Sequence, residues 1–199
     1  RLTNPVQVTS AIGVENYPTW APDGQRLAYQ SEQSGNEDIW VTQLGRGEPV
    51  NWTEDHTGRD VYPSWSPDGQ RLAYVSFEQG NSAIWVQSVA TGQREQVSAG
   101  KGINGAPAFS PDGRYLFGSS FLTGVSNIFR YEIETGDMQA VSNAETGFFR
   151  PIPREDGSLV VFEFTGKGFV PSVIDPVPLE DLSAIVFLGN EIVKKHPVL

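Results

Sequence analysis

Short runs of alternating apolar and polar residues, separated by turn residues, occupy most of the chain. Two such runs are Arg26-Leu-Ala-Tyr-Gln-Ser31 and Asp38-Ile-Trp-Val-Thr-Gln-Leu44. Alternation of this kind is typical of β-strands, and it does not fit the period of a helix. The turn Ala21-Pro-Asp-Gly24 precedes the first run. Pro presets φ there, Asp bonds its own backbone and Gly takes a positive φ. The pattern therefore predicts an all-β protein of short strands joined by tight turns.

The turn belongs to a phrase that the chain contains four times. Three copies are closely similar, at residues 17–24 (YPTWAPDG), 62–69 (YPSWSPDG) and 106–113 (APAFSPDG), and a degenerate copy lies at 150–157 (RPIPREDG). The final glycine of the phrase thus recurs at intervals of 44 or 45 residues. Self-similarity at such a period marks a repeat array, in which one unit cannot bury its apolar face alone.

Each repeat contains three or four strand-forming runs. The predicted strands are Tyr17–Trp20, Arg26–Ser31, Asp38–Leu44 and Pro49–Thr53 in the first repeat, Arg71–Ser76, Ala83–Val89 and Glu95–Ser98 in the second, and Arg114–Ser119, Asn127–Ile133 and Met138–Ser142 in the third. Four antiparallel strands in a repeat of this length are typical of a β-propeller blade. Aromatic residues occupy fixed repeat positions, and we expect them to pack between blades. The residues to which we assign a structural role in the repeat are Trp20, Pro22, Asp23, Gly24, Trp65, Pro67, Asp68, Gly69, Phe109, Pro111, Asp112 and Gly113.

The repeat resembles one known family. The sequence Trp/Phe-Ser-Pro-Asp-Gly, followed by Leu-Ala-Tyr and later by Gly-Asn and Ile-Trp, looks like the TolB-type propeller repeat of the bacterial Tol–Pal system and related bacterial proteins. The resemblance covers roughly residues 5–175 and is weakest in the fourth repeat, where Arg154-Glu155 replaces Ser-Pro. It implies a bacterial cell-envelope protein located in the periplasm, and it does not by itself supply a site.

TolB-type propellers usually close with six blades, whereas this chain has four copies of the repeat. The segment Pro5–Thr9 aligns with Pro49–Thr53. It belongs either to a preceding blade or, as a closing strand through Val6–Thr9, to the fourth repeat, which lacks a fourth strand of its own. We expect an all-β propeller of about four four-stranded antiparallel blades, forming an open arc or part of a larger ring, with a short mixed tail. The expected boundaries are 1–175 for the blades (repeats near 14–53, 59–98, 104–142 and 148–174) and 176–199 for the tail.

The tail departs from the repeat rhythm after Pro176. Ser183–Leu188 reads as a strand, and Asn190 is a good N-cap for a short helix that Pro197 ends. A single helix from Leu179 to Lys195 is the alternative, and Gly189 weighs against it. The tail also looks like the connector that joins a TolB-type propeller to a following module, often one in the outer membrane. We therefore expect a segment of a longer envelope protein.

Charge and composition restrict the classes of partner and site that we expect for this chain. The chain carries 24 acidic and 14 Lys and Arg residues, for a net charge of −10. Binding to nucleic acid is disfavoured because phosphate contacts need clustered basic residues. There is no cysteine, which excludes disulfides and thiolate metal sites. No apolar run approaches the roughly 20 residues of a transmembrane helix.

Candidate catalytic groups are few. The two histidines are His56 and His196, and no Gly-x-Ser-x-Gly motif accompanies them. We interpret His56 as a solvated loop residue and the Asp-Gly pairs as turn formers rather than calcium ligands. The formal glycosylation acceptor Asn51-Trp-Thr53 is discounted because it lies in a predicted strand. We therefore expect no catalytic residue, no cofactor and no metal.

A binding surface remains as the expected functional feature. Strand parity places the variable loops on one face of the blades and the Pro-Asp-Gly turns on the other, and variable loops on a rigid scaffold often carry recognition. The candidate partner-binding residues are Glu54, Asp55, Arg59, Asp60, Phe77, Phe121 and Phe148. The sequence predicts a non-catalytic protein–protein interaction scaffold, and the resemblance to TolB-type propellers implies that its partners are cell-envelope components. The alternatives are the substrate-gating propeller of a larger prolyl-oligopeptidase-type serine hydrolase and a carbohydrate-binding or lyase propeller, for which the histidines are too few.

Overall fold

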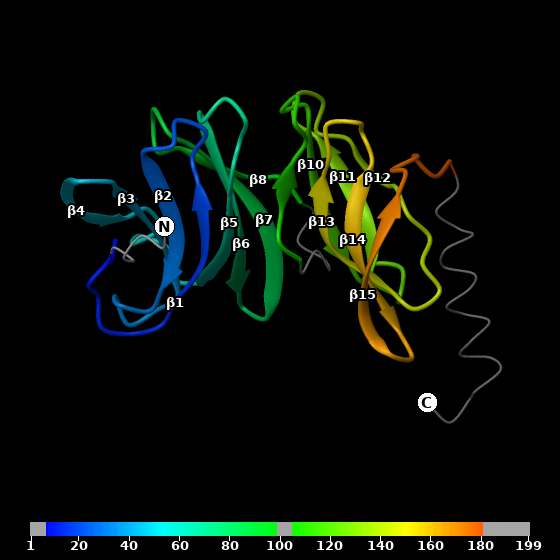
Figure 1. Cartoon of the computed structure of the whole chain (residues 1–199), viewed down its shortest axis with the longest axis horizontal. Helices are drawn as coiled ribbons and strands as arrows, with labels where there is room; N and C mark the ends of the chain where they lie inside the picture. Colours follow the sequence, from blue (N-terminus) through cyan, green and yellow to red (C-terminus); the bar gives the residue numbers. More distant parts are fainter. Residues whose placement is uncertain (1–6, 99–104, 181–199) are drawn as a thin grey trace, which may run out of the picture.

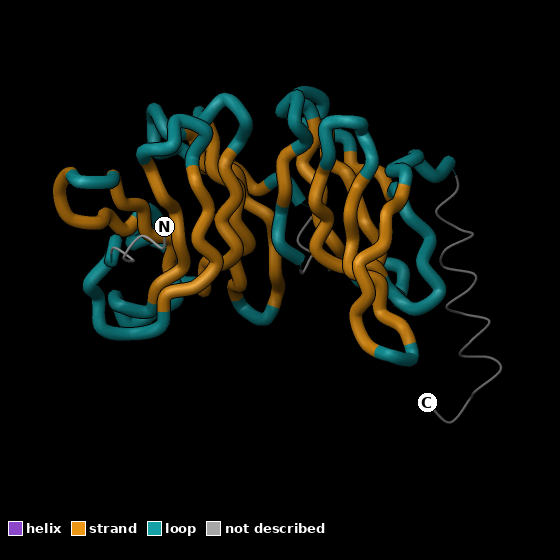
Figure 2. Tube along the Cα trace, in the orientation of Figure 1, coloured by secondary structure: helices purple, strands orange, loops and turns teal. Residues whose placement is uncertain are grey.

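The structure, a computed structural model, describes residues 7–98 and 105–180, and all of the regular secondary structure there is β-strand (Figure 1, Figure 2). The strands form four separate antiparallel sheets that stand side by side. The expectation of an all-β propeller arc is confirmed. The expected closing strand Val6–Thr9 lies partly outside the described residues. Most of the tail, including His196, lies outside them as well.

Each sheet is formed by strands that are consecutive in the sequence. The first blade contains β1 (Glu15–Trp20), β2 (Arg26–Ser31), β3 (Asp38–Gln43) and β4 (Arg46–Asn51); the second contains β5 (Arg59–Trp65), β6 (Arg71–Glu78), β7 (Asn81–Ser88) and β8 (Arg94–Gln96); the third contains β9 (Ala108–Phe109), β10 (Tyr115–Ser120), β11 (Asn127–Glu132) and β12 (Met138–Ala140); and the fourth contains β13 (Phe148–Pro153), β14 (Leu159–Thr165) and β15 (Gly168–Ile174). The strand order within every sheet follows the chain. The fourth sheet has three strands, in agreement with the missing strand signal in the fourth repeat.

The first strand of each blade lies on the inner side of the arc. Strand β5 lies against β1, β2 and β3 of the first blade, and β13 lies against β9, β10 and β11 of the third. Strand β5 also approaches β9. The first strands of neighbouring blades thus lie close to one another along the inner side of the arc, which we call its axis.

Three apolar clusters fill the spaces between neighbouring blades. Between the first and second blades, Trp65, Leu72 and Tyr74 pack against Ile39 and other residues of the first. Between the second and third, Phe109 and Leu116 pack against a valine-rich face of the second. Between the third and fourth, Leu159 and Val161 pack against a face of the third that includes Ile128. Burial of these side chains is the main favourable contribution to docking of the blades.

The two outer sheets each leave one face uncovered. Trp20 pairs with Leu27 in the register in which Trp65 pairs with Leu72. Trp20 therefore points away from the second blade, and it is 51% exposed whereas Trp65 is 7% exposed. At the other end, Ile152, Phe164 and Val173 are exposed on the fourth sheet. The arc is thus open.

The described part of the N-terminal segment adjoins the first blade. The hydroxyl of Thr9 donates a hydrogen bond to a carboxylate oxygen of Glu15, at the start of β1. Residues 7–10 form no strand. In the described residues, therefore, nothing adds a fourth strand to the β13–β15 sheet.

Candidate functional site

The variable loops gather on one face of the arc and are joined to each other by hydrogen bonds. The amide of Asn36, in the β2–β3 loop, donates to the carbonyl of Gly58 in the connection to the second blade. The backbone N–H of Asp60 donates to the carbonyl of Glu37 at 2.7 Å. Between the last two blades, the N–H of Phe148 donates to the carbonyl of Ser126 at 2.8 Å. We call this side the variable-loop face; its loops are residues 32–37, 52–58, 79–80, 121–126, 141–147 and 166–167.

The opposite face carries the repeated Asp-Gly turns. In each turn the aspartate accepts a hydrogen bond from the backbone N–H two residues further along, for example from Gln70 to Asp68 at 2.9 Å and from Arg114 to Asp112 at 3.0 Å. The Ser66 and Ser110 hydroxyls also donate to these carboxylates, and these bonds lower the pKa of Asp68 and of Asp112. The turn aspartates are thus occupied with local backbone contacts.

Three of the charged candidate residues are exposed on or beside the variable-loop face. Glu54 and Asp55 lie in the β4–β5 loop, where the Asp55 carboxylate pairs with Arg94 at 3.2 Å. Arg59 pairs with Glu37, and its guanidinium lies 5.2 Å from the centre of the Phe77 ring. Arg59 is therefore an exposed side chain whose position is fixed by an ion pair with Glu37 and by a contact with the Phe77 ring.

The aromatic candidates differ in exposure. Phe121 is 49% exposed and stands beside the exposed Leu122. Phe77 is half-buried against the cluster between the second and third blades. Phe148 is half-buried against the cluster between the third and fourth. Phe121 is therefore the most exposed of the three aromatic candidates.

The structure corrects the expectation for Asp60, which is fully buried and does not reach the surface. Its carboxylate oxygens lie 2.9 and 3.0 Å from His56 Nδ1. Burial raises the pKa of the Asp60 carboxyl, although hydrogen bonds from Ser76 and His56 act in the opposite direction. Asp60 is thus an internal acceptor for the loop that leads into β5.

His56 is likewise not a solvated loop residue. Its side chain is 6% exposed, its Nε2 lies 2.7 Å from Glu78, and its ring stands edge-on to Trp85 with centroids 5.6 Å apart. The Ser76 hydroxyl lies 3.1 Å from the same Nδ1 that contacts Asp60. A Ser-His-Asp nucleophilic set needs serine and aspartate on different ring nitrogens. The grouping therefore has the residues of a triad without its geometry.

Sequence reasoning missed a position on the inner strands. Tyr17, Tyr62 and Arg150 stand at the same place in the repeat, immediately before its proline, and each has a positive φ of 49–58°. This conformation is uncommon for bulky residues, and at each site it falls where the pairing register of the strand shifts. The rings of Tyr17 and Tyr62 are 4.5 Å apart. The bulge thus turns these three side chains toward the axis of the arc.

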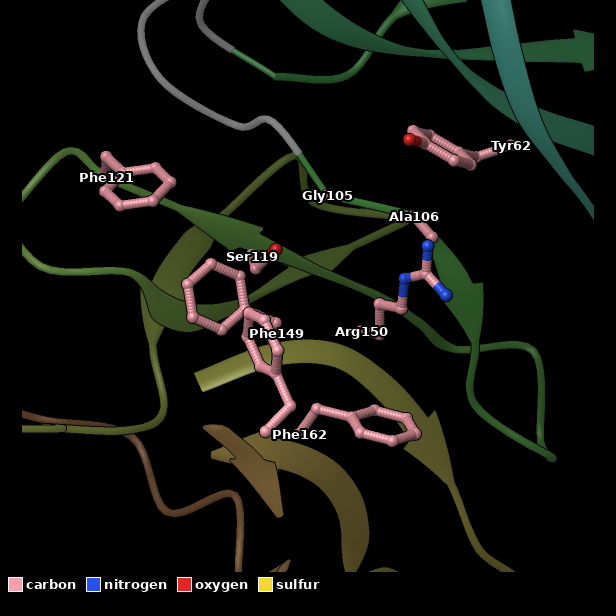
Figure 3. A pocket seen from close by; sticks show the side chains of 9 residues that line it. Tyr62, Gly105, Ala106, Ser119, Phe121, Phe149, Arg150 and Phe162 are labelled. Atoms are coloured by element: carbon pink, nitrogen blue, oxygen red, sulfur yellow. The ribbon is translucent and has the colours of Figure 1, made fainter. Parts of the chain in front are cut away.

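A pocket of about 520 Å³ opens beside this position, between the second, third and fourth blades (Figure 3). Its lining is mostly aromatic and includes one cationic side chain. The lining residues are Tyr62, Gly105, Ala106, Ser119, Phe121, Phe149, Arg150, Phe162 and Phe169. Of these, only Phe121 was expected at a site. The signal in the sequence was the first position of the repeated phrase, which varies (Tyr, Tyr, Ala, Arg) while the following proline is constant.

Residues 7–98 and 105–180 contain no group of three or more His, Cys, Asp or Glu side chains arranged to hold a metal ion. Nor does that part of the chain form a helix of sufficient length and apolarity to cross a bilayer.

Comparison with known proteins identifies the repeats. Residues 54–173 match the family described as the TolB beta propeller domain. None of the curated proteins matches the chain in sequence.

Solved structures with the same fold include two TolB proteins. The structure of TolB from Acinetobacter baumannii is similar with a TM-score of 0.75 and 22% identity, over 86% of this chain and 44% of that one. That of a putative TolB from Agrobacterium tumefaciens is similar with a TM-score of 0.75 and 22% identity, over 84% of this chain and 64% of that one. A puromycin-hydrolyzing peptidase of Mycobacterium tuberculosis is similar with a TM-score of 0.61 and 18% identity, over 82% of this chain and 27% of that one. The chain thus spans less than two thirds of the length of each of these relatives.

Proposed function

The chain belongs to the TolB beta propeller domain family, and on that premise we propose that it is a non-catalytic scaffold for protein–protein interaction in a bacterial cell envelope. The family and the similar TolB structures support a location in the periplasm as part of this proposal. The partner is a protein of the same compartment. Nucleic acid is disfavoured as a partner because the chain has a net charge of −10.

The observation that carries the proposal is the pair Phe121 and Leu122. Both are large apolar side chains, 49% and 47% exposed, at the start of the β10–β11 loop. The loop lies on the variable-loop face, and its Ser126 bonds to Phe148 of the next blade. An exposed apolar pair on a loop held by a rigid sheet favours recognition, because little conformational entropy is lost on binding.

The non-catalytic part of the proposal is supported by the contacts of His56. Both of its ring nitrogens are engaged by neighbouring side chains, and the ring is buried behind Trp85. A general base needs a free nitrogen within reach of a substrate proton. If the purified chain hydrolysed peptide or ester substrates and His56→Ala abolished that activity, the chain would act as a hydrolase and the proposal would be wrong.

The binding test uses a double variant, Phe121→Asp with Leu122→Asp. Both side chains are about half exposed and belong to none of the clusters between the blades, so the fold should be retained. The full chain is used to capture partners from a bacterial envelope extract, the captured protein is identified by mass spectrometry, and its affinity is then measured with purified components. We expect the double variant to weaken that affinity by at least about tenfold, as hot-spot residues do.

Leu44→Asp is the matched control. Leu44 is 42% exposed, and it lies at the β3–β4 turn on the side opposite the variable-loop face. It should leave binding unchanged. Equal affinity of the chain and the double variant for the identified partner would remove the variable-loop face as the binding surface. Phe148 is unsuitable for this test, because its ring packs against the cluster between the third and fourth blades.

A further inference from the structure

The pocket beside the bulge position, which we call the axial pocket, is lined by aromatic rings that contact one another edge to face. Phe121 and Phe149 have centroids 5.9 Å apart at 61°, and Phe149 and Phe169 have centroids 5.3 Å apart at 88°. Phe121 and Phe169 are nevertheless 49% and 58% exposed. Aromatic rings prefer such edge-to-face contacts. A further ring entering the pocket would extend this array and remove the exposed faces from water.

The pocket has a single charged wall, which Arg150 supplies. Figure 3 shows the guanidinium beside Ala106, between Tyr62 and Phe162. Within residues 7–98 and 105–180, no carboxylate forms an ion pair with it; the group to which it comes close is the Tyr17 ring, at 5.7 Å. Most of the other arginines there pair with a carboxylate, and the whole chain is strongly acidic. The charge of Arg150 is therefore left for a ligand.

The backbone holds Arg150 in this place. Its φ of 49° lies in the left-handed region, where a non-glycine residue is strained. Strain of this kind is found where the surrounding structure fixes a side chain for a purpose. The strand register shifts between Phe149 and Ile152, so the bulge presents Arg150 and Phe149 to the same pocket.

Volume and charge together define the ligand. A volume of about 520 Å³ lies in the range of small-molecule sites. The walls suit an aromatic group, and the guanidinium suits a planar carboxylate, which it binds with two parallel hydrogen bonds. No acidic residue lines the pocket, so a cationic ligand would lack a counter-charge. We propose that the pocket binds a ligand that consists of an aromatic ring carrying a carboxylate.

The experiment is a titration of the full chain by calorimetry with 3-phenylpropionate. Its neutral analogue 3-phenylpropionamide and the ring-free acid propionate serve as ligand controls. We expect the acid to bind and both controls to bind at least about tenfold more weakly. Absence of heat with 3-phenylpropionate at millimolar concentration, or equal affinity for the amide, would overturn the proposal without any variant being made.

Variants then test the charged side chain and the aromatic lining of the pocket separately. Arg150→Gln should weaken binding of 3-phenylpropionate at least about tenfold, and Phe169→Ala should weaken it as well. Arg46→Gln is the matched control, because Arg46 is also exposed but lies on β4, away from the pocket. Circular dichroism checks that each variant keeps the sheet structure. An unchanged affinity in Arg150→Gln would contradict the assignment of the carboxylate to that residue.

A second titration separates the two sources of this chemistry. N-acetylphenylalanine carries the same ring and carboxylate as the C-terminal residue of a polypeptide, whereas 3-phenylpropionate represents a free aromatic acid. Tighter binding of the former supports a polypeptide C-terminus as the natural ligand, and tighter binding of the latter supports a free acid. Failure of this proposal is distinguishable from failure of the scaffold proposal, because the ligand titrations use the unmodified chain and variants at Arg150 and Phe169, whereas the partner-binding experiment alters Phe121, which also lines the pocket, and Leu122.

Discussion

The guanidinium of Arg150 lies 5.7 Å from the centre of the Tyr17 ring, although the two residues belong to the last and the first blade. Tyr17 in turn contacts Tyr62 of the second blade edge-on at 4.5 Å. Residues from three blades thus meet on the axis through the same repeat position. The arc is open at its outer sheets and yet joined across its centre.

The pair Trp20 and Trp65 gives a prediction about the stability of the array. Both occupy one repeat position, but Trp65 is buried between the first two blades and Trp20 faces solvent. Trp65→Ala should reduce the free energy of unfolding by about 3–5 kcal/mol, as deletion of a buried indole does. Trp20→Ala should reduce it by less than about 1 kcal/mol. Urea unfolding of the two variants measures the difference, and equal losses would mean that the blades do not pack as described.

Gly58 gives a prediction about close approach of the backbone. A Cβ added there would lie 2.5 Å from the carbonyl oxygen of Phe77, which is backbone and cannot rotate away. Gly58→Ala should therefore destabilise the fold by about 1–3 kcal/mol. Gly166→Ala is the control, because a Cβ there meets no atom within 4 Å. Thermal unfolding should show a lower midpoint for the first variant and little change for the second.

The buried Asp60 predicts a dependence of stability on pH. Burial raises its pKa above the ordinary value of 3.8. The native state therefore favours the protonated form, and the stability that this group contributes is present below pH 3.8 and lost as pH rises through the raised pKa. Asn cannot ionise, so Asp60→Asn avoids that loss.

The measurement for Asp60 compares the two proteins over a range of pH. The free energy of unfolding of Asp60→Asn, minus that of the unmodified chain, should increase from about pH 3.5 to pH 7, by about 1.4 kcal/mol for each unit of pKa elevation. Denaturant titrations at several pH values supply both quantities. A difference that falls over this range would show that the contacts with His56 and Ser76 outweigh the cost of burial.

For the turn aspartates Asp68 and Asp112 we expect the opposite dependence, because their contribution to stability is lost as pH falls. The pKa values of Asp68 and Asp112 are lowered by hydrogen bonds from Ser66 and Ser110. Their contribution to stability is present above the ordinary pKa and lost as pH falls through the lowered one. The double variant Asp68→Asn with Asp112→Asn should be less stable than the unmodified chain at pH 6, by less than about 1 kcal/mol for each exposed site. The gap should close between about pH 4 and pH 2, and a constant gap would exclude ionisation as its cause.

The strands of the blades could be predicted from the sequence because the local turn and strand signals agree with the packing of the blades there. The strand predicted at Arg26–Ser31 is observed with those bounds, since a Pro-Asp-Gly turn precedes it and polar residues follow. The strand predicted at Pro49–Thr53 is observed at Arg46–Asn51, so it begins three residues earlier and ends two residues earlier. There the tight Gly45 turn allows pairing to begin at once, from Arg46 to Gln43.

The site was less predictable because burial and side-chain direction depend on distant residues. His56 looked solvated in the sequence, yet Trp85 and Glu78 enclose it from other strands. The direction of Arg150 depends on a bulge that no pattern of hydrophobic residues reveals. The pocket combines Phe121 with Phe169, which neither the repeat nor chain proximity brings together.

The bulge before the repeat proline separates two kinds of sequence change. Substitutions at that position alter which side chains face the centre of the molecule. Tyr17 and Arg150 belong to none of the three clusters that join the blades, whereas Tyr62 packs against the cluster between the second and third. In the first and fourth blades this residue can therefore be exchanged without loss of a contact in those clusters, whereas in the second blade an exchange also alters the packing against the third.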